Sequence, residues 1–435
     1  MTKALLEEAG PDGPAGLSSV AIIGMGYVGL PTALGLHASG VSVLGIDHSS
    51  ARLAAIMAGE VDLIDADQRR LDKSVQEEGF ELTADIARLA EADAVMVCVP
   101  TPIDRYLMPD LAPLSGACAT VVKYARPGQT LILTSTSFVG TTARMLVEPL
   151  AAKGFTVGVD IFVASSPERI DPGNVTHTQQ ETPRVLGGVT ARCSAMAERV
   201  LEVLTPSVHK VNSPEAAEMT KLYENSFRAV NIALANEFAD ICVGLSLDPT
   251  EITDAAATKP YGFMTFRPGP GVGGHCIPCD PHYLLWQLRE TRTTAPLVSQ
   301  AMTAIAERPK QVVDRVLNVL SDTGKGIAGT RVVVVGVTYK PGVQDVRSSS
   351  ALDIIGYLID RGAKVDYYDP LVSTVALGSG HLDSAIQPHG TDWDLALIHT
   401  VHPEHDYAWL SSCPIIVDAT YTFESDDTPG LPQPA

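Results

Sequence analysis

The sequence lacks long hydrophobic runs and an excess of basic residues. Its longest apolar stretches, such as 94–99 and 332–337, have the length of a strand and are far too short to span a membrane. The formal net charge of -20 argues against a broad basic surface for nucleic acid, although a few well-placed cations can still hold an anionic ligand. Residues 1–16 also lack the apolar segment of a signal peptide. We therefore expect the protein to bind neither membrane nor nucleic acid.

The sequence also lacks a disulfide framework. Its 7 cysteines, an odd number, are scattered over the chain, so we expect a reducing, cytoplasmic location. At 435 residues the chain is long enough for two or three hydrophobic cores. A composition of 45% hydrophobic and 19% charged residues is typical of α/β proteins.

Short apolar runs alternate with helical patterns in the first half of the chain. The expected strands are 20–23, 41–46, 94–99, 130–133 and 160–164, and the first expected helix is 31–39. Strands that alternate with helices indicate βαβ units and a parallel sheet.

The pattern changes after residue 213. Apolar residues recur at helical spacing from Ser213 to Asp254, which predicts a long central helix, and a loop rich in Gly and Pro follows at 260–281. Two further helices are expected at 296–306 and 310–320. The βαβ pattern then returns, with strands at 331–336, 364–368, 394–399 and 415–419 and a helix at 350–360. The predicted fold is α/β, with two Rossmann-like, doubly wound parallel-sheet domains joined by a central helical domain.

A glycine motif lies between the first expected strand and helix. Gly24, Gly26 and Gly29 have the GxGxxG spacing, and Asp47 closes the second expected strand. In such a motif the glycines make a tight turn, admit a pyrophosphate and let the helix pack closely, while the acid binds a ribose hydroxyl. An acid at this place favours NAD over NADP, whose extra phosphate it would repel.

Cys276 lies in the loop rich in Gly and Pro, where backbone N–H groups can stabilise a thiolate. A buried structural thiol is the simplest alternative. Cys276 and Cys279 could form a redox pair, but such a pair normally opens a helix directly after a strand, and Pro281 with the preceding run of glycines argues against that context. His275, Cys276, Cys279 and His282 could bind zinc, but they crowd into eight residues without a second cluster. We therefore expect no metal and no catalytic role for Cys279.

Three further polar residues are candidates for chemistry. Lys221 and Asn225 stand four residues apart on the central helix and share one face, among apolar neighbours that leave little of the helix to water. A lysine near a core suggests proton transfer or oxyanion stabilisation. Glu168 follows the strand 160–164 at the sheet edge where ligands bind, although a surface glutamate is the simpler alternative.

The chain resembles the UDP-glucose/GDP-mannose dehydrogenase family over nearly its whole length. Six stretches in the family order carry the resemblance: IGMGYVGLP, VCVPTP, SSPERIDPGN, KLYENSFRAVN, GPGVGGHCIPCDP and YKPGVQDVRSSS. Within the family, GGHCIPxDP and KPYGFMTFRPGPG resemble the branch that oxidises UDP-N-acetylhexosamines. The glucose and mannose branches usually carry Lys where this chain has Cys279, and UDP- or dTDP-glucose is the alternative substrate.

The resemblance implies an NAD-dependent 6-dehydrogenase that takes a sugar CH2OH to a carboxylate through a thiohemiacetal and a thioester on Cys276, for polysaccharide biosynthesis. It implies a homodimer with a leader (1–18), an NAD-binding domain (19–210), a central helical dimerisation domain with the cysteine loop (211–308), a nucleotide-sugar domain (309–425) and a tail (426–435).

By position, the resemblance assigns site residues. The cofactor would contact Gly24, Gly26, Tyr27, Val28, Gly29, Asp47, Arg52, Thr101, Thr136 and Arg347. Catalysis would use Cys276, Lys221, Asn225, Glu168, Asp280 and Thr136. The substrate would contact Glu168, Arg169, Lys221, Asn225, Lys259, Gly273, Gly274, Lys340 and Arg347. Lys259 stands beside Pro260, where the family places a basic residue that reaches the partner subunit.

Two other functions compete with this one. A two-electron hydroxyacid dehydrogenase can also pair Lys and Asn on a central helix, but has no use for Cys276 or a second α/β domain. A non-catalytic dinucleotide sensor would keep the fold and form no NADH.

Overall fold

The computed structural model describes residues 17–169, 181–274, 276–378 and 380–422. The chain divides into two compact units, residues 1–224 with 282–292 and residues 225–281 with 293–435. The three domain limits expected from the sequence remain a prediction, and the tail and nearly all of the leader lie outside the described residues. Among the described helices, none combines the length and apolar character needed to cross a membrane.

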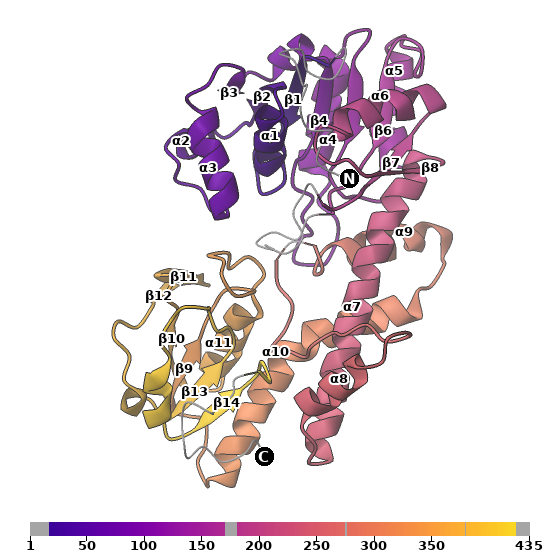
Figure 1. Cartoon of the computed structure of the whole chain (residues 1–435). Helices are drawn as coiled ribbons and strands as arrows, with labels where there is room; N and C mark the ends of the chain where they lie inside the picture. The colour runs from indigo at the N-terminus through magenta and orange to yellow at the C-terminus, as the bar shows by residue number, and fades with distance from the viewer. Residues whose placement is uncertain (1–16, 170–180, 275, 379, 423–435) are drawn as a thin grey trace, which may run out of the picture. The chain divides into compact units, whose positions relative to one another are not determined.

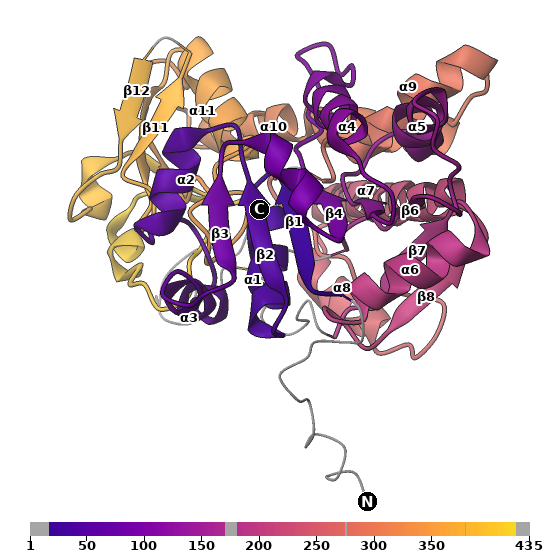
Figure 2. The ribbon, with the colours of Figure 1, turned by 90° about the horizontal axis from the view of Figure 1, so that it is seen from above.

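The first unit is built on one sheet (Figures 1 and 2). Its strands are β1 Ser19–Ile23, β2 Ser42–Ile46, β3 Phe80–Thr83, β4 Ala94–Val97, β5 Thr130–Leu133, β6 Phe162–Ser165, β7 Arg184–Gly188 and β8 Val208–Val211. They lie in the order β3-β2-β1-β4-β5-β6-β7-β8. The first six follow the 3-2-1-4-5-6 order of dinucleotide-binding sheets, in which ligands bind where the order reverses, between β1 and β4.

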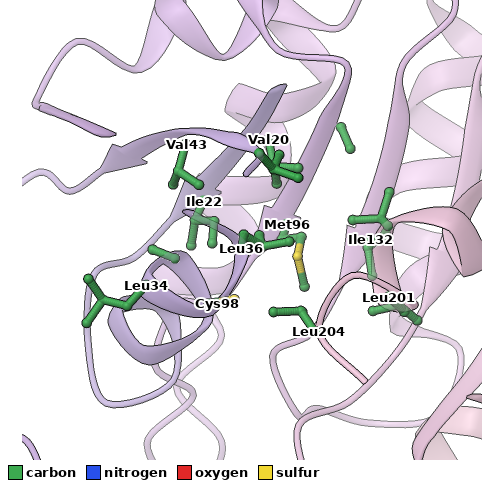
Figure 3. Packing of buried hydrophobic residues seen from close by; sticks show 14 of the residues in the cluster. Val20, Ile22, Leu34, Leu36, Val43, Met96, Cys98, Ile132, Leu201 and Leu204 are labelled. Atoms are coloured by element: carbon green, nitrogen blue, oxygen red, sulfur yellow. The ribbon is translucent and has the colours of Figure 1, made fainter. Parts of the chain in front are cut away.

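Helices cover both faces of this sheet. One face carries α1 Gly29–Ala38, α2 Ser50–Met57, α3 Asp65–Ser74 and α6 Ala191–Leu201; the other carries η1 Ile86–Glu91, α4 Ala112–Tyr124, η2 Ala143–Val147 and α5 Glu148–Ala152. Val20 and Ile22 of β1 pack toward Leu34 and Leu36 of α1 (Figure 3). The alternate residues of β1 belong to the opposite core, so this strand is apolar on both faces, as a central parallel strand should be.

The expected strands of the first half are confirmed to within two residues, and their neighbours are parallel with one exception. β7 runs antiparallel to β6, with Ala164 opposite Gly188 and Ser165 opposite Gly187. The sequence pattern did not predict this reversal, which matters for the site described below.

The long central helix ends earlier than predicted. α7 Pro214–Gly244 is followed by a separate helix, α8 Pro249–Ala257, whereas the sequence pattern extended one helix to Asp254. Asp248 caps α8 by accepting from the N–H of Thr250, and Pro249 occupies its first turn. An N-capping Asp and a Pro in the first turn both mark the start of a helix. The apolar periodicity therefore continues across the boundary between two helices.

The two helices expected at 296–306 and 310–320 are one helix, α10 Pro296–Asp322. The prediction of a break was wrong, although an interior proline costs a helix roughly 3 kcal/mol. Packing offsets this cost because Pro309 itself is buried in a continuous apolar stripe. The stripe runs through Met302, Ile305, Val312, Val316 and Leu320.

The second unit holds a smaller parallel sheet in the order β10-β9-β13-β14 (Figure 1). Its elements are β9 Arg331–Val335, α11 Ser350–Asp360, β10 Lys364–Tyr368, β13 Leu395–Ile398 and β14 Ile416–Asp418. These match the expected elements, and the α/β fold class is confirmed. α10 and α11 cover one face, while Trp393, Tyr407 and Leu410, in and beside the short helices η3 Gly390–Asp392 and η4 Ala408–Ser412, cover the other. A hairpin of β11 Thr374–Leu377 and β12 Gly380–Asp383, which the sequence pattern did not predict, completes this unit.

Candidate functional site

The glycine motif forms a tight turn at the carboxyl end of β1. Gly24 has a φ of 92°, and its N–H donates to Ile46 O at 2.8 Å. A Cβ on Gly29 would lie 1.8 Å from Gly24 O, so only glycine lets α1 start this close to the turn. A Cβ on Gly26 would meet no atom within 4 Å, which leaves the space that a pyrophosphate needs.

Asp47 and Arg52 are both fastened to this turn through Met25. The Asp47 carboxylate accepts from Met25 N at 2.9 Å and from Ser49 N at 2.9 Å, and Arg52 Nε donates to Met25 O at 2.9 Å. A carboxylate oxygen can accept two hydrogen bonds, and each Asp47 oxygen accepts one from the backbone. Asp47 can therefore orient the turn and still accept a hydrogen bond from a ribose hydroxyl. The observed turn therefore fits NAD. Tyr27 is exposed beside it, and Val28 is the residue that precedes α1.

The remaining expected cofactor residues of the first unit follow strands of the same sheet. Thr101 is buried in the loop after β4, and Thr136 is half-buried in the loop after β5. Both loops leave the carboxyl edge, beside the point where strand order reverses.

Glu168 is buried and paired with an arginine that the sequence analysis did not identify. Its carboxylate lies 2.5 Å from the guanidinium of Arg184, and the two side chains are 8% and 2% exposed. The reversed strand β7 explains the pair: extending its register three residues beyond Ser165 sets Glu168 opposite Arg184. A surface position for Glu168 is thereby excluded.

The Cys98 thiol lies in the same buried environment. Burial, with a smaller contribution from the charge of Glu168, raises the pKa of Cys98 to about 12 against the opposing effect of Arg184. A thiol with such a pKa stays protonated and unreactive at neutral pH. Cys98 is therefore a packing residue.

Arg169 does not extend into open space. Its guanidinium donates to both carboxylate oxygens of Glu224, at 2.5 and 3.2 Å, and to Pro183 O at 2.7 Å. A substrate contact by Arg169 would have to share or replace these partners, and the role expected for it remains a prediction.

Lys221 is buried on α7, with 8% of its surface exposed. It makes no ion pair with any residue in the part of the chain that the structure describes. Nearby on the same helix, Glu218 accepts from Gly140 N, Thr142 N and Thr142 Oγ1, which anchors this end of α7. A buried ammonium is costly unless an anionic group meets it, so a lysine at this place is suited to stabilising negative charge.

Asn225, Cys276 and Asp280 come together in the second unit. Asn225 Nδ2 donates to Asp280 Oδ2 at 2.5 Å, and both residues are buried. Asp280 N donates to Cys276 O at 2.9 Å, and Cys279 N to the same oxygen at 3.3 Å. A turn starting at Cys276 thus leads directly into α9 Asp280–Thr291. Cys276 is half-buried, whereas Cys279 is 5% exposed.

This geometry corrects one reason given against a redox pair. Pro281 lies in the first turn of α9, where proline is favoured, so it does not exclude a helix after Cys279. The pair still follows glycines, not a strand. His275 lies outside the described residues. His282 has a pKa lowered by burial and by Arg289, and no cluster suited to a metal occurs among the described residues.

Gly273 and Gly274 pack against the segment that carries Lys340 and Arg347. A Cβ on Gly273 would lie 2.5 Å from Tyr339 Cβ, and Gly274 N donates to Arg347 O at 2.9 Å. The loop that bears Cys276 and this segment therefore form one packed structure within the second unit.

The expected cationic contacts of the substrate are accessible. Lys340 is half-buried with its Nζ 5.8 Å from the Tyr339 ring, and the exposed Arg347 forms a bidentate pair with Asp345. Lys259 is exposed and lies over the Tyr261 ring at 5.3 Å.

The turn after β9 repeats the hydrogen bonds of the turn after β1. Gly336 has a φ of 81°, its N–H donates to Tyr368 O at 2.8 Å, and Val337 N donates to Asp369 Oδ2 at 2.8 Å. Gly24, Met25 and Asp47 make the corresponding contacts in the first unit. The sequence analysis missed this repeat because the second turn lacks the GxGxxG spacing.

Asp369 serves the protein itself, not a ribose. It is 3% exposed and lies 3.3 Å from His402 Nε2. Burial opposes its ionisation, but hydrogen bonds from His402 and Val337 N outweigh this and leave the pKa of Asp369 below its usual value. Gly342 N donates to His402 Nδ1 at 3.1 Å, so the neutral ring carries its proton on Nε2. These contacts fix the loop that carries Lys340.

Models of three domains of the UDP-glucose/GDP-mannose dehydrogenase family match the chain in order. The NAD binding domain matches residues 18–205, the central domain residues 215–305 and the UDP binding domain residues 333–425.

Characterised relatives are similar over most of their length. A UDP-N-acetyl-D-glucosamine 6-dehydrogenase of Pseudomonas aeruginosa is 33% identical over 81% of this chain and 83% of its own. A UDP-N-acetyl-D-mannosamine dehydrogenase of Methanocaldococcus jannaschii is 34% identical over 89% of this chain and 86% of its own. The solved structure of a UDP-D-ManNAc dehydrogenase from Pyrococcus horikoshii superposes with a TM-score of 0.85 at 30% identity, covering 93% of this chain and 96% of that one.

Proposed function

The chain belongs to the UDP-glucose/GDP-mannose dehydrogenase family and uses NAD, and on this premise we propose that it oxidises C6 of a UDP-N-acetylhexosamine from CH2OH to carboxylate. The observation that carries the proposal is the buried Asn225–Asp280 pair joined to the turn of Cys276. It supplies a thiol, an amide donor and a carboxylate within one short part of the second unit.

NAD, when bound, supplies the hydride acceptor. The turn of Gly24, Gly26 and Gly29 would hold its pyrophosphate, and Asp47 its adenosine ribose, because the open space at Gly26 and the spare lone pairs of Asp47 suit these groups. Arg52, Thr101 and Thr136 would complete the contacts.

The first oxidation turns the C6 alcohol into an aldehyde. As hydride leaves the carbon, a base removes the hydroxyl proton, and Lys221 or a water held by Asp280 takes this role. The thiolate of Cys276 then adds to the aldehyde carbon, forming a C–S bond and an alkoxide that is protonated to a thiohemiacetal. The trapped aldehyde carbon again carries a transferable hydrogen.

The second oxidation leaves a thioester on Cys276. Loss of the hydroxyl proton and of hydride restores the carbonyl, and a second NAD balances the two additional electrons. Lys221 and Asn225 would stabilise the oxyanions before and after this step as hydrogen-bond donors. Water activated by Glu168 would add to the thioester, break the C–S bond and release the carboxylate with the free thiol.

UDP-N-acetylglucosamine or its C2 epimer is the proposed substrate, and UDP- or dTDP-glucose is the alternative. The relatives that act on N-acetylated sugars and the motif at Cys276 support this choice. Lys340 and Arg347 would bind the diphosphate, and Lys259 would reach the site of a partner subunit. A pocket built for an N-acetyl group is filled poorly by a hydroxyl, so turnover should favour the amide-bearing sugars.

An exposed apolar stripe on α7 supports a homodimer. Phe227, Leu234, Phe238 and Ile241 recur at helical spacing on one face, Leu245 continues the spacing directly after the helix, and each is at least 40% exposed. A stripe of this size on a monomer would be unusual, and pairing with a second copy would bury it. The free cysteines of the described residues and a thiol-dependent mechanism suit the reducing cytoplasm.

The test of the proposed function is a panel of nucleotide sugars assayed for NADH and for the acid product. UDP-N-acetylglucosamine or UDP-N-acetylmannosamine should react fastest. Faster turnover of UDP- or dTDP-glucose would change the substrate but keep the mechanism. No NADH with any sugar nucleotide would leave the non-catalytic sensor as the better account.

A further inference from the structure

A single glycine at the start of the loop that bears Cys276 is held through both of its backbone polar groups. Gly269, seven residues before Cys276, donates its N–H to Asn236 Oδ1 at 2.8 Å. Its carbonyl accepts from Arg308 Nε at 3.0 Å. Asn236 lies on α7 and Arg308 on α10, so two separate helices bind the backbone of Gly269 within the second unit.

Arg308 is built into the structure for this contact. It is 3% exposed, and Nη1 donates to both oxygens of Asp240 at 2.7 and 2.8 Å. Nη2 donates to Tyr421 Oη at 3.0 Å, and Gln311 provides a further acceptor at 3.3 Å. A buried guanidinium needs acceptors for all of its N–H groups. Here Asp240, Gln311 and Tyr421 bind the two Nη atoms, and Nε donates to the loop.

Between Gly269 and Cys276, the described glycines of the loop are held through their backbone. Gly271, Gly273 and Gly274 carry no side chain, and their backbone packs directly on Tyr339 and Ser350. Gly269 lies between Pro268 and Pro270, whose φ angles are restricted, so the backbone on both sides of it is stiff. The position of the Cys276 thiol should therefore depend on how Gly269 is held and on the turn into α9.

We propose that Asn236 and Arg308 are positioning residues that place Cys276 by clamping the backbone of Gly269 on both sides of its Cα, an inference that rests on the proposed function of Cys276 as nucleophile. Asp240 and Tyr421 hold Arg308 in turn. A nucleophile misplaced by about 1 Å can lose roughly a hundredfold in rate. A loosened clamp should thus let the aldehyde escape before the thiol traps it.

The test compares Asn236→Ala and Arg308→Lys with matched variants in the full-length enzyme. Asn236→Asp keeps an acceptor for Gly269 N–H and should restore function, while Gln311→Ala removes a contact of Arg308 that does not touch the loop. For Asn236→Ala and Arg308→Lys, we expect kcat to fall about 10- to 100-fold. The KM for the sugar nucleotide should change less than about threefold, since uniform binding is untouched. NADH per sugar should fall from near two toward one, with aldehyde recovered by a trapping agent.

Hydrogen exchange gives a readout that does not require activity. Because Pro268 and Pro270 have no N–H, Gly269 supplies the only exchanging amide between them, and its signal is unambiguous. Both clamp variants should speed exchange at Gly269 and in the loop to Cys276, and Gln311→Ala should not.

Unchanged exchange, or a ratio that stays near two in both clamp variants, would overturn the proposal. So would a loss of rate that Asn236→Asp fails to restore, because the residue would then serve folding alone. If the wild type itself forms no acid, the proposed function fails, while exchange at Gly269 still decides whether the clamp exists.

Discussion

Removing one partner of the buried pair of Glu168 and Arg184 should strongly destabilise the first unit. Arg184→Met removes the cation and leaves a carboxylate with 8% of its side chain exposed and its 2.5 Å partner missing. Breaking a buried ion pair from one side costs about 3–5 kcal/mol, because one charge stays buried and uncompensated. Arg184→Met with Glu168→Gln removes both charges and should recover most of that loss.

The assay is hydrogen exchange at increasing urea, read on peptides from β5 to β7, since a chain of two units need not unfold in one step. Arg184→Lys keeps the charge without the planar fork and should fall between the single and double variants. A cost below about 1 kcal/mol for Arg184→Met would match an exposed pair and refute the burial argument.

The same variants separate stability from chemistry. The double variant should fold well but hydrolyse the thioester slowly, so a mass increase on Cys276 should accumulate during turnover. Full wild-type turnover by Glu168→Gln would remove this residue from the hydrolysis step.

Three other predictions concern separate parts of the chain. Asp47→Ala should weaken NAD binding by about 1–3 kcal/mol, the scale of a charge-assisted hydrogen bond; an unchanged KM for NAD would reduce Asp47 to a support of its turn. Burial lowers the pKa of His399 to about 3. Between that value and 6.5 the unfolded state binds a proton that the folded state does not. The free energy of unfolding is therefore highest above pH 6.5 and falls as the pH falls. From pH 7 to 5 the second unit of the wild type should therefore lose about 2 kcal/mol more than His399→Gln, and equal losses in a urea series would contradict the buried neutral ring. Phe238→Glu places a charge in the apolar stripe of α7 and should shift the protein toward monomer in sedimentation; a monomeric wild type would show that the stripe has another use.

Local patterns predicted much of the fold. The strands on both sides of the glycine motif, the helix 350–360 and the strand 364–368 follow from apolar runs whose ends are marked by turn residues. The same patterns failed where distant packing decides the outcome. Two helices were expected where α10 is continuous, because the buried stripe on both sides of Pro309 stabilises one helix. Asp248 and Pro249 begin α8 inside a region whose periodicity appeared continuous.

The site shows the same division. The turn at Gly24 and the bond from Asn225 to Asp280 involve residues that the sequence analysis had singled out. Arg184 could not be found this way, because its role depends on the reversed direction of β7 and on a register that no local pattern encodes. Arg308 was hidden for a similar reason, since its partners lie on α7, in the loop at Gly269 and near the end of the described chain.

The central claim is that Cys276 retains the intermediate so that one enzyme performs both oxidations. The most direct test limits UDP-N-acetylglucosamine, runs the reaction to completion with excess NAD and counts NADH by absorbance, with an aldehyde-trapping agent in a parallel sample. We predict two NADH for each sugar and almost no trapped aldehyde, and for Cys276→Ser no acid and at most slow aldehyde formation. One NADH for each sugar with trapped aldehyde from the wild type, or full acid production by Cys276→Ser, would contradict the account.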